Sequence, residues 1–497
     1  MGLNRDTVRR RLSIERGALT KEAPHQIALA YPSPYGAGMS SLGYQRIYRL
    51  IQELDGFSCE RFFLDDDAET NLEMQTRPLS YESLRPFEAF AAIAFSVAYE
   101  IEIAGVVRML DASGIDAERK MRREDDSIVL LGGPLTFSNP LPLAAIGDII
   151  IMGEAEEITP RVLEVLVSPL SKAEKLKAIA DIEHVFVPAV HGSDMPRVAA
   201  VDNEMLPAWA PIMTPDTVLS DMFLIETERG CSRGCAYCVM RRSTNGGMRI
   251  VAKERILGLI PEDAKRVGLV GAAVSDHPKI VEIVNELCDR GIEVGLSSLR
   301  PDRLTDAFVG ALKRGGYKTL TTAMDGPSER LRDLLNRKAR IKHLLQCAEL
   351  AREHKMDRLK LYLMIGLPGE TDEDIDECVA FSTELSKRIP LSLGIAPFCA
   401  KRNTPLDGEP FAGIKVVHER LERLKRGVKG RVEIRSTSAK WAWVEYVLAQ
   451  GGVAEGEAVV RAARAGGGFA DYKRSFESLG ESGTMKRPKR KLAIATL

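Results

Sequence analysis

Three cysteines stand close together near the middle of the 497-residue chain, at a spacing suited to an iron–sulfur site. Cys231, Cys235 and Cys238 form a CxxxCxxC pattern, and Gly230 and Gly234 leave the backbone free to bend around a bound group. Three thiolates on a short loop can ligate three irons of a cubane cluster. The fourth iron then stays open to a small molecule that chelates it through an amine and a carboxylate.

Zinc is the alternative ligand for this loop, because soft thiolates also bind zinc. Structural zinc takes four ligands, and no fourth Cys or His lies nearby in the sequence; the next candidates are His277 and Cys288. A chance grouping of buried cysteines is a third interpretation. Of the three, we expect the cubane cluster.

A strand must end just before the cysteine loop, because the preceding segment is apolar and β-type. Strand and helix patterns alternate from there to about residue 397, which predicts a partial α/β barrel with fewer units than the eight of a closed one. Barrel enzymes work at the carboxyl ends of the strands, where this loop lies. The expected strands are Phe223–Thr227, Val267–Val270, Glu293–Ser297, Thr319–Thr322, Leu359–Ile365 and Leu391–Pro397.

A second α/β pattern precedes the barrel and predicts a doubly wound, Rossmann-like domain. Loops rich in Gly and Pro follow three of its strands, at Pro32–Gly43, Gly132–Pro140 and Gly153–Glu157. Tight turns explain any one of them, but three on one sheet edge favour a ligand crevice. The expected strands are Ile27–Tyr31, Cys59–Leu64, Ala91–Val97, Ile128–Leu131 and Ile149–Met152.

Changes in composition divide the chain into five parts. We expect an N-terminal extension (1–24), the Rossmann-like domain (25–187), a proline-rich linker (188–220), the barrel (221–407) and a small, mostly helical C-terminal region (408–497). The best helices of the last region are Val416–Arg426 and Ala439–Gln450. Its basic run at Lys486–Lys491 is more typical of a solvated tail than of a nucleic-acid contact.

The overall composition indicates a protein of the cytoplasm. Lys and Arg total 69 against 70 Asp and Glu, so the net charge of −1 gives no reason to expect nucleic acid or an anionic membrane. The eight cysteines are too sparse for a disulfide framework. The charged N-terminus has no signal-peptide core, and the longest apolar run, Ile146–Met152, is too short to cross a bilayer.

The cysteine loop, with Tyr237 just before its third cysteine, resembles the signature of the radical S-adenosylmethionine superfamily. The resemblance covers about residues 25–450 and implies an enzyme whose [4Fe–4S] cluster reductively cleaves S-adenosylmethionine to a 5′-deoxyadenosyl radical. It implies that Tyr237 packs beside that cofactor and that an electron donor such as flavodoxin or ferredoxin reduces the cluster. The protein itself holds the reactants and excludes water.

Barrel segments after the second and third strands resemble the family's contacts to S-adenosylmethionine. The usual Gly-Gly-Glu of the second strand is missing, so Ser275 or Asp276 would receive the amino group. Ser298 and Arg300 would hold the ribose hydroxyls and the carboxylate, since a guanidinium grips a carboxylate with two parallel bonds. Helix capping by Ser298 and a surface ion pair of Arg300 are equally open explanations.

The fourth to sixth strands carry further similar segments. Asp325 occupies the place of the family's glutamate, one methylene shorter, and would help to position the cofactor. Ile365 and Gly366 lie in the fifth-strand segment against which the adenine packs, and Ile395–Pro405 resembles the sixth segment. Turn formation alone also explains the glycine of the fifth segment.

A Rossmann-like domain ahead of such a barrel resembles the cobalamin-binding branch of the superfamily. Gly132 and Gly133 match the branch's Gly-Gly loop, and Gly153 and Glu154 match its Gly-Glu-x-Glu loop. The segment Ala439–Gly452 is similar to the tail of a largely uncharacterised subgroup. This resemblance implies bound cobalamin.

The branch's Asp-x-His-x-x-Gly motif, which supplies a lower axial ligand to cobalt, is missing; His25 and His184 lack that context. Branch members without the histidine exist, and an apolar or water-capped lower face would make the cobalt a better methyl donor to a radical. A domain that kept its shape and lost the cofactor is the alternative.

The resemblance implies methylation of an unactivated carbon. The alternative within the family is a cobalamin-independent enzyme that abstracts hydrogen for rearrangement, oxidation or coupling, and the alternative of another class is a non-catalytic binding protein. Methylthiotransferases bind a second cluster through three cysteines in their first domain, where this chain has only Cys59. Enzymes with auxiliary clusters need cysteines after the barrel, and none follows Cys399.

Overall fold

The computed structural model describes residues 5–66, 77–240, 247–297 and 299–480, which form two compact units. The first unit joins the chain up to Glu226 with the segment from Gly451 onward, and the second contains Thr227 to Gln450. The expected linker (188–220) and the end of the expected C-terminal region therefore belong to the first unit. The expected Ser298 and the basic run 486–491 lie outside the described residues.

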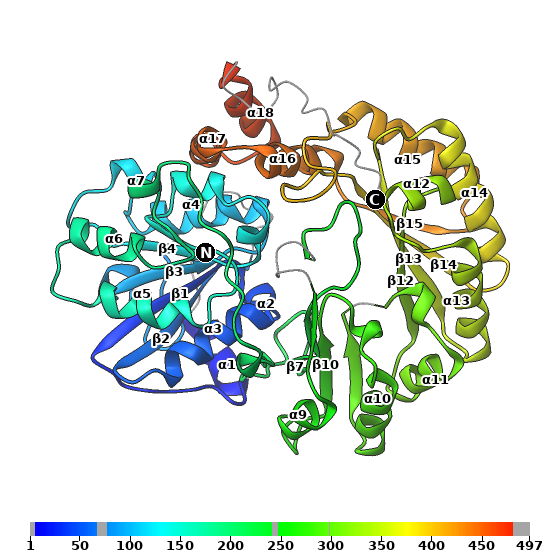
Figure 1. Ribbon diagram of the computed structural model, residues 1–497, viewed down its shortest axis with the longest axis horizontal. Helices are drawn as coiled ribbons and strands as arrows, with labels where there is room; N and C mark the ends of the chain where they lie inside the picture. Colours follow the sequence, from blue (N-terminus) through cyan, green and yellow to red (C-terminus); the bar gives the residue numbers. More distant parts are fainter. Residues whose placement is uncertain (1–4, 67–76, 241–246, 298, 481–497) are drawn as a thin grey trace. The chain divides into compact units, whose positions relative to one another are not determined.

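A six-stranded sheet of order β2-β1-β3-β4-β5-β6 forms the centre of the first unit (Figure 1). The first five strands are parallel and β6 is antiparallel to β5, so the predicted Rossmann-like fold is confirmed. The strand order reverses between β1 and β3, which is where ligands bind in such sheets. The strands are β1 (His25–Pro34), β2 (Phe57–Leu64), β3 (Ala92–Ser96), β4 (Val129–Gly132), β5 (Ile149–Ile151) and β6 (Val185–Phe186).

Helices cover this sheet with their apolar rows. On α3, Tyr44, Tyr48 and Ile51 recur at helical spacing and are all buried. Ser41 caps the same helix by accepting a hydrogen bond from the Tyr44 N–H at 3.3 Å. The helices of the unit are α1 (Arg5–Ile14), α2 (Tyr35–Gly38), α3 (Leu42–Glu53), α4 (Ile103–Ala112), α5 (Ile158–Leu166), α6 (Lys172–Ala180), α7 (Pro188–His191), α17 (Val453–Arg464) and α18 (Phe469–Glu477).

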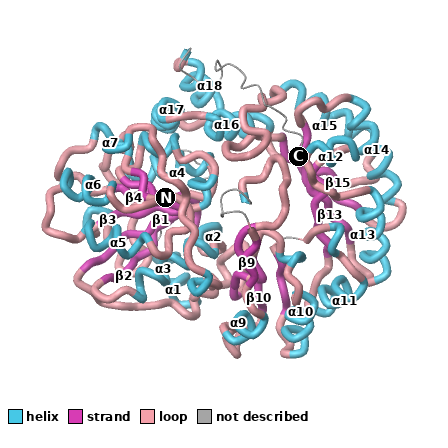
Figure 2. Tube along the Cα trace, viewed as in Figure 1, coloured by secondary structure: helices cyan, strands magenta, loops and turns pink. Residues whose placement is uncertain are grey.

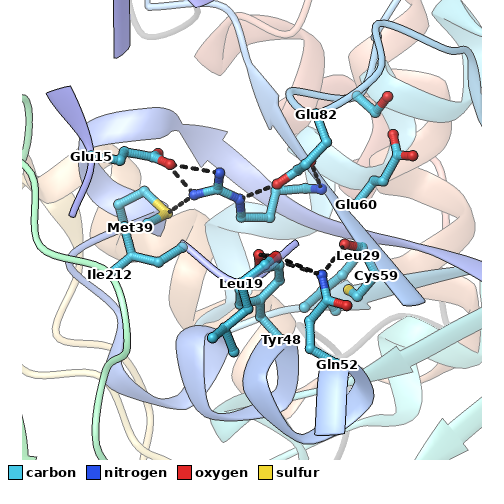
Figure 3. Close-up of polar contacts among 12 residues, drawn as sticks. Glu15, Leu19, Leu29, Met39, Tyr48, Gln52, Cys59, Glu60, Glu82 and Ile212 are labelled. Atoms are coloured by element: carbon cyan, nitrogen blue, oxygen red, sulfur yellow. Dashed lines mark hydrogen bonds and ion pairs between the residues drawn. The ribbon is translucent and has the colours of Figure 1, made fainter. Parts of the chain in front are cut away.

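A buried ion network ties the N-terminal segment to the sheet (Figure 3). Arg61 on β2 donates to both carboxylate oxygens of Glu15 at 2.8 Å and to Glu82 at 2.5 Å. Burying a guanidinium is costly, and the two carboxylates offset that cost because they keep it paired. The expected N-terminal extension is thus part of the first unit.

The barrel strands lie in two sheets, of order β11-β10-β7 and β12-β13-β14-β15, and a hairpin of β8 and β9; all of them except β7 belong to the second unit. All six expected strands form. The strands are β7 (Phe223–Glu226), β8 (Glu228–Gly230), β9 (Met248–Ile250), β10 (Arg266–Val270), β11 (Glu293–Leu296), β12 (Thr319–Asp325), β13 (Arg358–Ile365), β14 (Leu391–Pro397) and β15 (Glu433–Ser436).

The chain after residue 408 is mostly helical, as expected, but it also contains one strand, β15. It pairs in parallel with β14, with Leu393 opposite Ile434. Its four residues, EIRS, hold a single apolar side chain, so they carry no detectable alternation. The strand therefore extends the barrel by one position that the sequence pattern does not reveal.

Helices cover the outer side of the four-stranded sheet, as Figures 1 and 2 show for α13, α14 and α15. None of the helices in the described part of the chain has the length and apolar character needed to cross a membrane. The helices of the unit are α9 (Lys253–Gly258), α10 (Ile280–Asp289), α11 (Asp306–Arg314), α12 (Glu329–Leu334), α13 (Ile341–Glu353), α14 (Asp372–Ser386), α15 (Ile414–Val428) and α16 (Ala439–Gln450).

Candidate active site

A cavity of about 240 Å³ lies where the cysteine loop meets the strands of the second unit. All three cysteines of the loop line it, together with residues from β12, β13 and the segments after β10 and β11. The lining residues are Cys231, Arg233, Cys235, Tyr237, Cys238, Met240, Ala272, Ser297, Leu299, Arg300, Thr321, Thr322, Ala323, Asp325, Arg337 and Tyr362. The structure thus brings the predicted cluster ligands into one site with Tyr237, Arg300 and Asp325.

Backbone contacts hold the cysteine loop in place. The Ala236 N–H donates to the Leu335 carbonyl at 2.9 Å, and the Leu406 N–H donates to the Ala236 carbonyl at 3.2 Å. The side-chain amide of Asn336 donates to the Gly234 carbonyl at 2.9 Å. Because these partners follow the loop by many residues, the loop is positioned by the folded barrel and not by its own sequence.

The thiols are buried, and nearby donors and a cation offset part of the cost of anionic sulfur. Burial raises the pKa of Cys231 and of Cys238, while the Arg300 guanidinium opposes that rise at Cys231. The Arg233 N–H also points to the Cys231 sulfur at 3.5 Å. These donors and cations stabilise thiolates once a metal replaces the protons. The residues present therefore fit a cluster that needs three thiolates.

Among the described residues, no group of three or more His, Cys, Asp and Glu side chains converges closely enough to hold one metal ion. A cubane makes a different demand, because each thiolate binds a separate iron. His277, a candidate fourth zinc ligand, has both ring nitrogens engaged: Nδ1 accepts from the Lys279 N–H at 3.1 Å, and Nε2 lies 2.9 Å from the Val251 carbonyl.

Tyr237, Asp325 and Arg337 form a buried polar group beside the cysteines. Asp325 ends β12 in a left-handed conformation (φ +63°) and is ion-paired with Arg337. Burial raises the pKa of Asp325, while Arg337 and a hydrogen bond from the Tyr237 hydroxyl oppose the rise. Arg337 also contacts the Cys235 side chain. Nothing in the sequence pattern around Arg337 indicates a site, so this residue was not predicted.

Arg300 lines the cavity and is held by neighbours that the sequence analysis assigned to cofactor contact. Its backbone N–H donates to the Ser275 hydroxyl at 2.9 Å, and its guanidinium lies 3.1 Å from Asp302. Asp276 pairs with Arg233 at 3.0 Å and with Arg303 at 3.0 Å.

Burial raises the pKa of Asp276, but these arginines outweigh it and hold that pKa below its ordinary value. Ser275 and Asp276 do not appear among the described residues that line the cavity, and Asp276 already has cationic partners. A role for either in receiving an amino group stays a prediction.

The predicted adenine-contact residues lie at the end of β13. Ile365 is buried, and its carbonyl accepts from the Phe398 N–H at 2.8 Å. Gly366 has φ +77°, and its N–H donates to the Glu370 carboxylate at 2.9 Å. A turn held by Glu370 thus explains the glycine, and the described lining of the cavity does not include either residue.

The glycine loops of the first unit support its own backbone. Gly133 (φ +105°) faces the Val97 backbone, where a Cβ would come within 2.6 Å of the carbonyl oxygen. Gly153 (φ +88°) faces the Ala199 backbone in the same way, at 2.7 Å. Glu154 accepts a hydrogen bond from the Val201 N–H at 2.9 Å.

Gly132 differs from these residues, because the nearest atom to a Cβ built on it is a carbonyl oxygen 4.0 Å away. Contacts within the first unit are therefore enough to explain Gly133, Gly153 and Glu154. Cofactor contact by any of the four residues stays a prediction.

Hydroxyls and carboxylates gather at the switch point between β1 and β3. Glu102 is buried and accepts from the Ala98 N–H at 2.6 Å, the Ser33 hydroxyl at 3.1 Å and the Tyr31 hydroxyl. Burial raises the pKa of Glu102, and these donors oppose the rise. Tyr99 follows β3 at this edge with 49% of its surface exposed. The edge is therefore braced by Glu102 and carries an exposed aromatic side chain.

Two family models match the chain. The model described as "Radical SAM proteins, N-terminal" matches residues 43–188, and the model of the radical SAM superfamily matches residues 225–382. The second match contains the whole cysteine loop. The chain belongs to the radical S-adenosylmethionine (radical SAM) superfamily.

Relatives of this radical SAM enzyme include an uncharacterized protein, MJ0966, of Methanocaldococcus jannaschii. It is 26% identical over 423 residues, which cover 82% of this chain and 85% of the relative. The ribosomal protein uS12 methylthiotransferase RimO of Clostridioides difficile is 24% identical over 270 residues, covering 50% of this chain and 54% of the relative.

Solved structures show a similar fold. The radical S-adenosylmethionine methyltransferase TsrM of Kitasatospora setae, solved with cobalamin and a [4Fe–4S] cluster, matches with a TM-score of 0.55. It is 14% identical, and the match covers 89% of this chain and all of TsrM. The cobalamin-dependent S-adenosylmethionine radical enzyme OxsB matches at 0.51 with 12% identity, over 83% of this chain and 58% of that protein. The two-unit fold of this radical SAM chain is thus shared with both.

Proposed function

We propose that this radical SAM enzyme binds cobalamin and a [4Fe–4S] cluster and methylates an unactivated carbon. The observation that carries the proposal is the cavity of the second unit, in which Cys231, Cys235 and Cys238 face Arg300, the cation suited to a carboxylate. When bound, the cluster would supply the electron that opens S-adenosylmethionine, and cobalamin would carry the methyl group.

The chain's own residues would then bind and orient the reactants. The three cysteines would hold the cluster. Arg300 would hold the carboxylate of S-adenosylmethionine from its position in the cavity lining, and Tyr237 would pack beside that cofactor. Asp325, paired with Arg337, would accept a hydrogen bond from the cofactor's ribose. The surrounding side chains would exclude water from the reacting atoms.

The support for cobalamin is the fold shared with TsrM, whose structure contains it, and the switch-point edge of the first sheet. Ser33, Glu102 and the exposed Tyr99 offer oxygen atoms and an aromatic surface at this edge. Glu102 is already occupied by donors from its own unit. These residues would line a bound cobalamin at this edge.

Anoxic reconstitution of the full-length protein tests the proposal. We expect iron and sulfide near cubane stoichiometry, a corrinoid absorption spectrum, and S-adenosylhomocysteine together with a methylated product. Formation of 5′-deoxyadenosine without corrinoid would favour the cobalamin-independent alternative, in which hydrogen abstraction leads to rearrangement, oxidation or coupling. Zinc in the loop, or no low-potential iron centre, would overturn the proposal altogether.

We further infer that a protein such as flavodoxin or ferredoxin reduces the cluster and that the enzyme works in the cytoplasm. The eight cysteines are too sparse for a disulfide framework, which favours a reducing compartment. Reduction by flavodoxin and its reductase should support S-adenosylmethionine cleavage. Failure of every protein donor, with cleavage only by dithionite, would argue against this partner class.

A further inference from the structure

The inner face of the four-stranded barrel sheet is polar and accessible, in contrast to its outer face. On β13, Leu359, Leu361 and Leu363 are buried on the helix-covered side, whereas Lys360 and Tyr362 alternate with them on the other side. Because the barrel is partial and not closed, this face stays accessible and offers room for a ligand.

The strand register arranges this face in rows. Lys360 lies opposite Thr321 on β12 and Ser392 on β14. In the next row towards the cysteine loop, Tyr362 lies opposite Ala323 and Gly394. The first row therefore offers an ammonium and two hydroxyls, and the second offers an aromatic ring between two small residues.

Tyr362 is held so that its ring borders the cavity. A Cβ on Gly394 would lie 2.6 Å from the ring, so only glycine lets the ring take this position. The side chain is 46% exposed, and it lines the same cavity as the three cysteines. A flat group packed against this ring would lie beside the reaction site.

The charge of this face is positive. Arg358 and Arg435 share the carboxylate of Glu433, with Arg435 at 2.7 Å, and Asp325 at the end of β12 is held by Arg337. The Lys360 ammonium instead lies over the Tyr362 ring, 4.7 Å from its centre. A ring attracts a cation without neutralising it, so Lys360 keeps its charge for an anionic ligand.

We propose that Lys360 and Tyr362 bind the substrate and that this substrate carries an anionic group attached to a planar group. The planar part lies beside the Tyr362 ring and the cysteines, and the anion pairs with the Lys360 ammonium, which lies over that ring, with Thr321 of the cavity lining as a hydroxyl partner. The inference rests on the proposed function, because it takes the cavity to be the place of reaction. It adds the chemical class of the substrate.

Phenyl phosphate is the probe, titrated calorimetrically into the reconstituted full-length protein without oxygen. Inorganic phosphate tests the anion alone, phenol tests the ring alone, and benzoate replaces the phosphate with a carboxylate. We expect phenyl phosphate or benzoate to bind at least about tenfold more tightly than inorganic phosphate or phenol. Whichever of phenyl phosphate and benzoate binds more tightly identifies the preferred anionic group.

Two variants assign the binding to this face. Lys360→Met should weaken binding of the stronger probe by about tenfold and reduce its salt dependence. Tyr362→Leu should reduce the affinity for phenyl phosphate to that for inorganic phosphate, or the affinity for benzoate to that for acetate. Lys387→Met is the matched control, since Lys387 lies at the end of α14 and pairs with Glu384 at 2.9 Å, and it should bind as the wild type does.

Thermal unfolding and iron content of each variant show whether the barrel stays intact. Failure of both probes to bind the wild type would overturn the inference, as would unchanged affinity in the intact Lys360 and Tyr362 variants. Cleavage of S-adenosylmethionine by a wild type that binds neither probe would leave the proposed function standing. Probe binding at this face by a protein that assembles no cluster would instead overturn the proposed function alone.

Discussion

Cys231, Cys235 and Cys238 share one cavity, whereas Cys288 lies on α10 with its sulfur 3.8 Å from the Ala311 carbonyl. Replacing Cys235 by Ala should reduce bound iron from about four atoms per chain to near zero, because two thiolates hold a cubane poorly. Iron analysis and electron paramagnetic resonance after anoxic reconstitution measure this loss. Cys288→Ala should keep full iron, and an iron-replete Cys235→Ala protein would contradict the assignment of the loop.

His277 should make the stability of the second unit depend on pH. Its Nδ1 accepts from the Lys279 N–H, so the ring is neutral with the proton on Nε2, and burial lowers its pKa. A folded-state pKa below the unfolded value of about 6.5 means that protons favour the unfolded state. The stability that neutral His277 contributes is complete above about pH 6.5 and is lost as the pH falls below that value.

Urea unfolding at pH 7.5 and pH 5.5 measures this effect. The free energy of unfolding should be lower at pH 5.5 in the wild type, and the difference should shrink in His277→Gln, whose amide does not titrate. Equal differences in the two proteins would show that other groups cause the pH dependence.

The sequence identified the cysteines of the site because their spacing is local, but it could not identify the residues that come from elsewhere. Arg337 reaches Asp325 from beyond α12, and Arg233 reaches Asp276 on the segment after β10. Such pairs depend on which strands lie side by side, and residue type alone does not reveal that arrangement. Tyr362 was missed for the same reason, since its significance comes from Gly394 on the neighbouring strand.

At the level of elements, most strands of both sheets were predictable because buried parallel strands are short apolar runs between turn residues. Helix α16 begins and ends at the predicted residues, Ala439 and Gln450. The strands that were missed, β6, β8, β9 and β15, have two to four residues each. Pairing with neighbours, and not their own pattern, makes these segments extended.

Helix α17 packs closely on the loop that precedes β5, and a glycine permits the contact. A Cβ on Gly456 would lie 2.1 Å from the Pro142 carbonyl oxygen, whereas a Cβ on Gly258 in α9 meets nothing within 4 Å. Gly456→Ala should therefore lower the free energy of unfolding by about 1–3 kcal/mol. Gly258→Ala should raise it by up to about 1 kcal/mol, because alanine favours helix.

Chemical denaturation of both variants measures the contrast. Equal stability of Gly456→Ala and Gly258→Ala would contradict the close contact between α17 and the loop before β5.

On the scale of the whole molecule, the first unit is built from two distant stretches of the chain. Helix α17 buries Val459 and Val460, and Arg464 pairs with Asp111 and Asp116 at 2.8 and 2.9 Å. Burial of the two valines contributes about 3–6 kcal/mol. Deleting residues 451–497 should therefore destabilise the first unit while the second retains its iron.

Calorimetry should show a lower melting temperature for the deletion variant, and limited proteolysis should show faster cleavage within residues 1–226. Arg464→Ala, which removes the surface ion pairs with Asp111 and Asp116, should change stability by less than about 1 kcal/mol. An unchanged melting temperature in the deletion variant would contradict the division of the chain.

This two-stretch construction also fixes an order of events during synthesis. The ribosome releases the strands of the first sheet, then the entire cysteine-bearing unit, and only afterwards the helix that covers the loop before β5. Apolar surface of the nascent N-terminal unit therefore stays uncovered until more than 220 residues of intervening chain (227–450) have been translated. Iron–sulfur assembly on the emerged loop can therefore precede completion of the unit that was begun first.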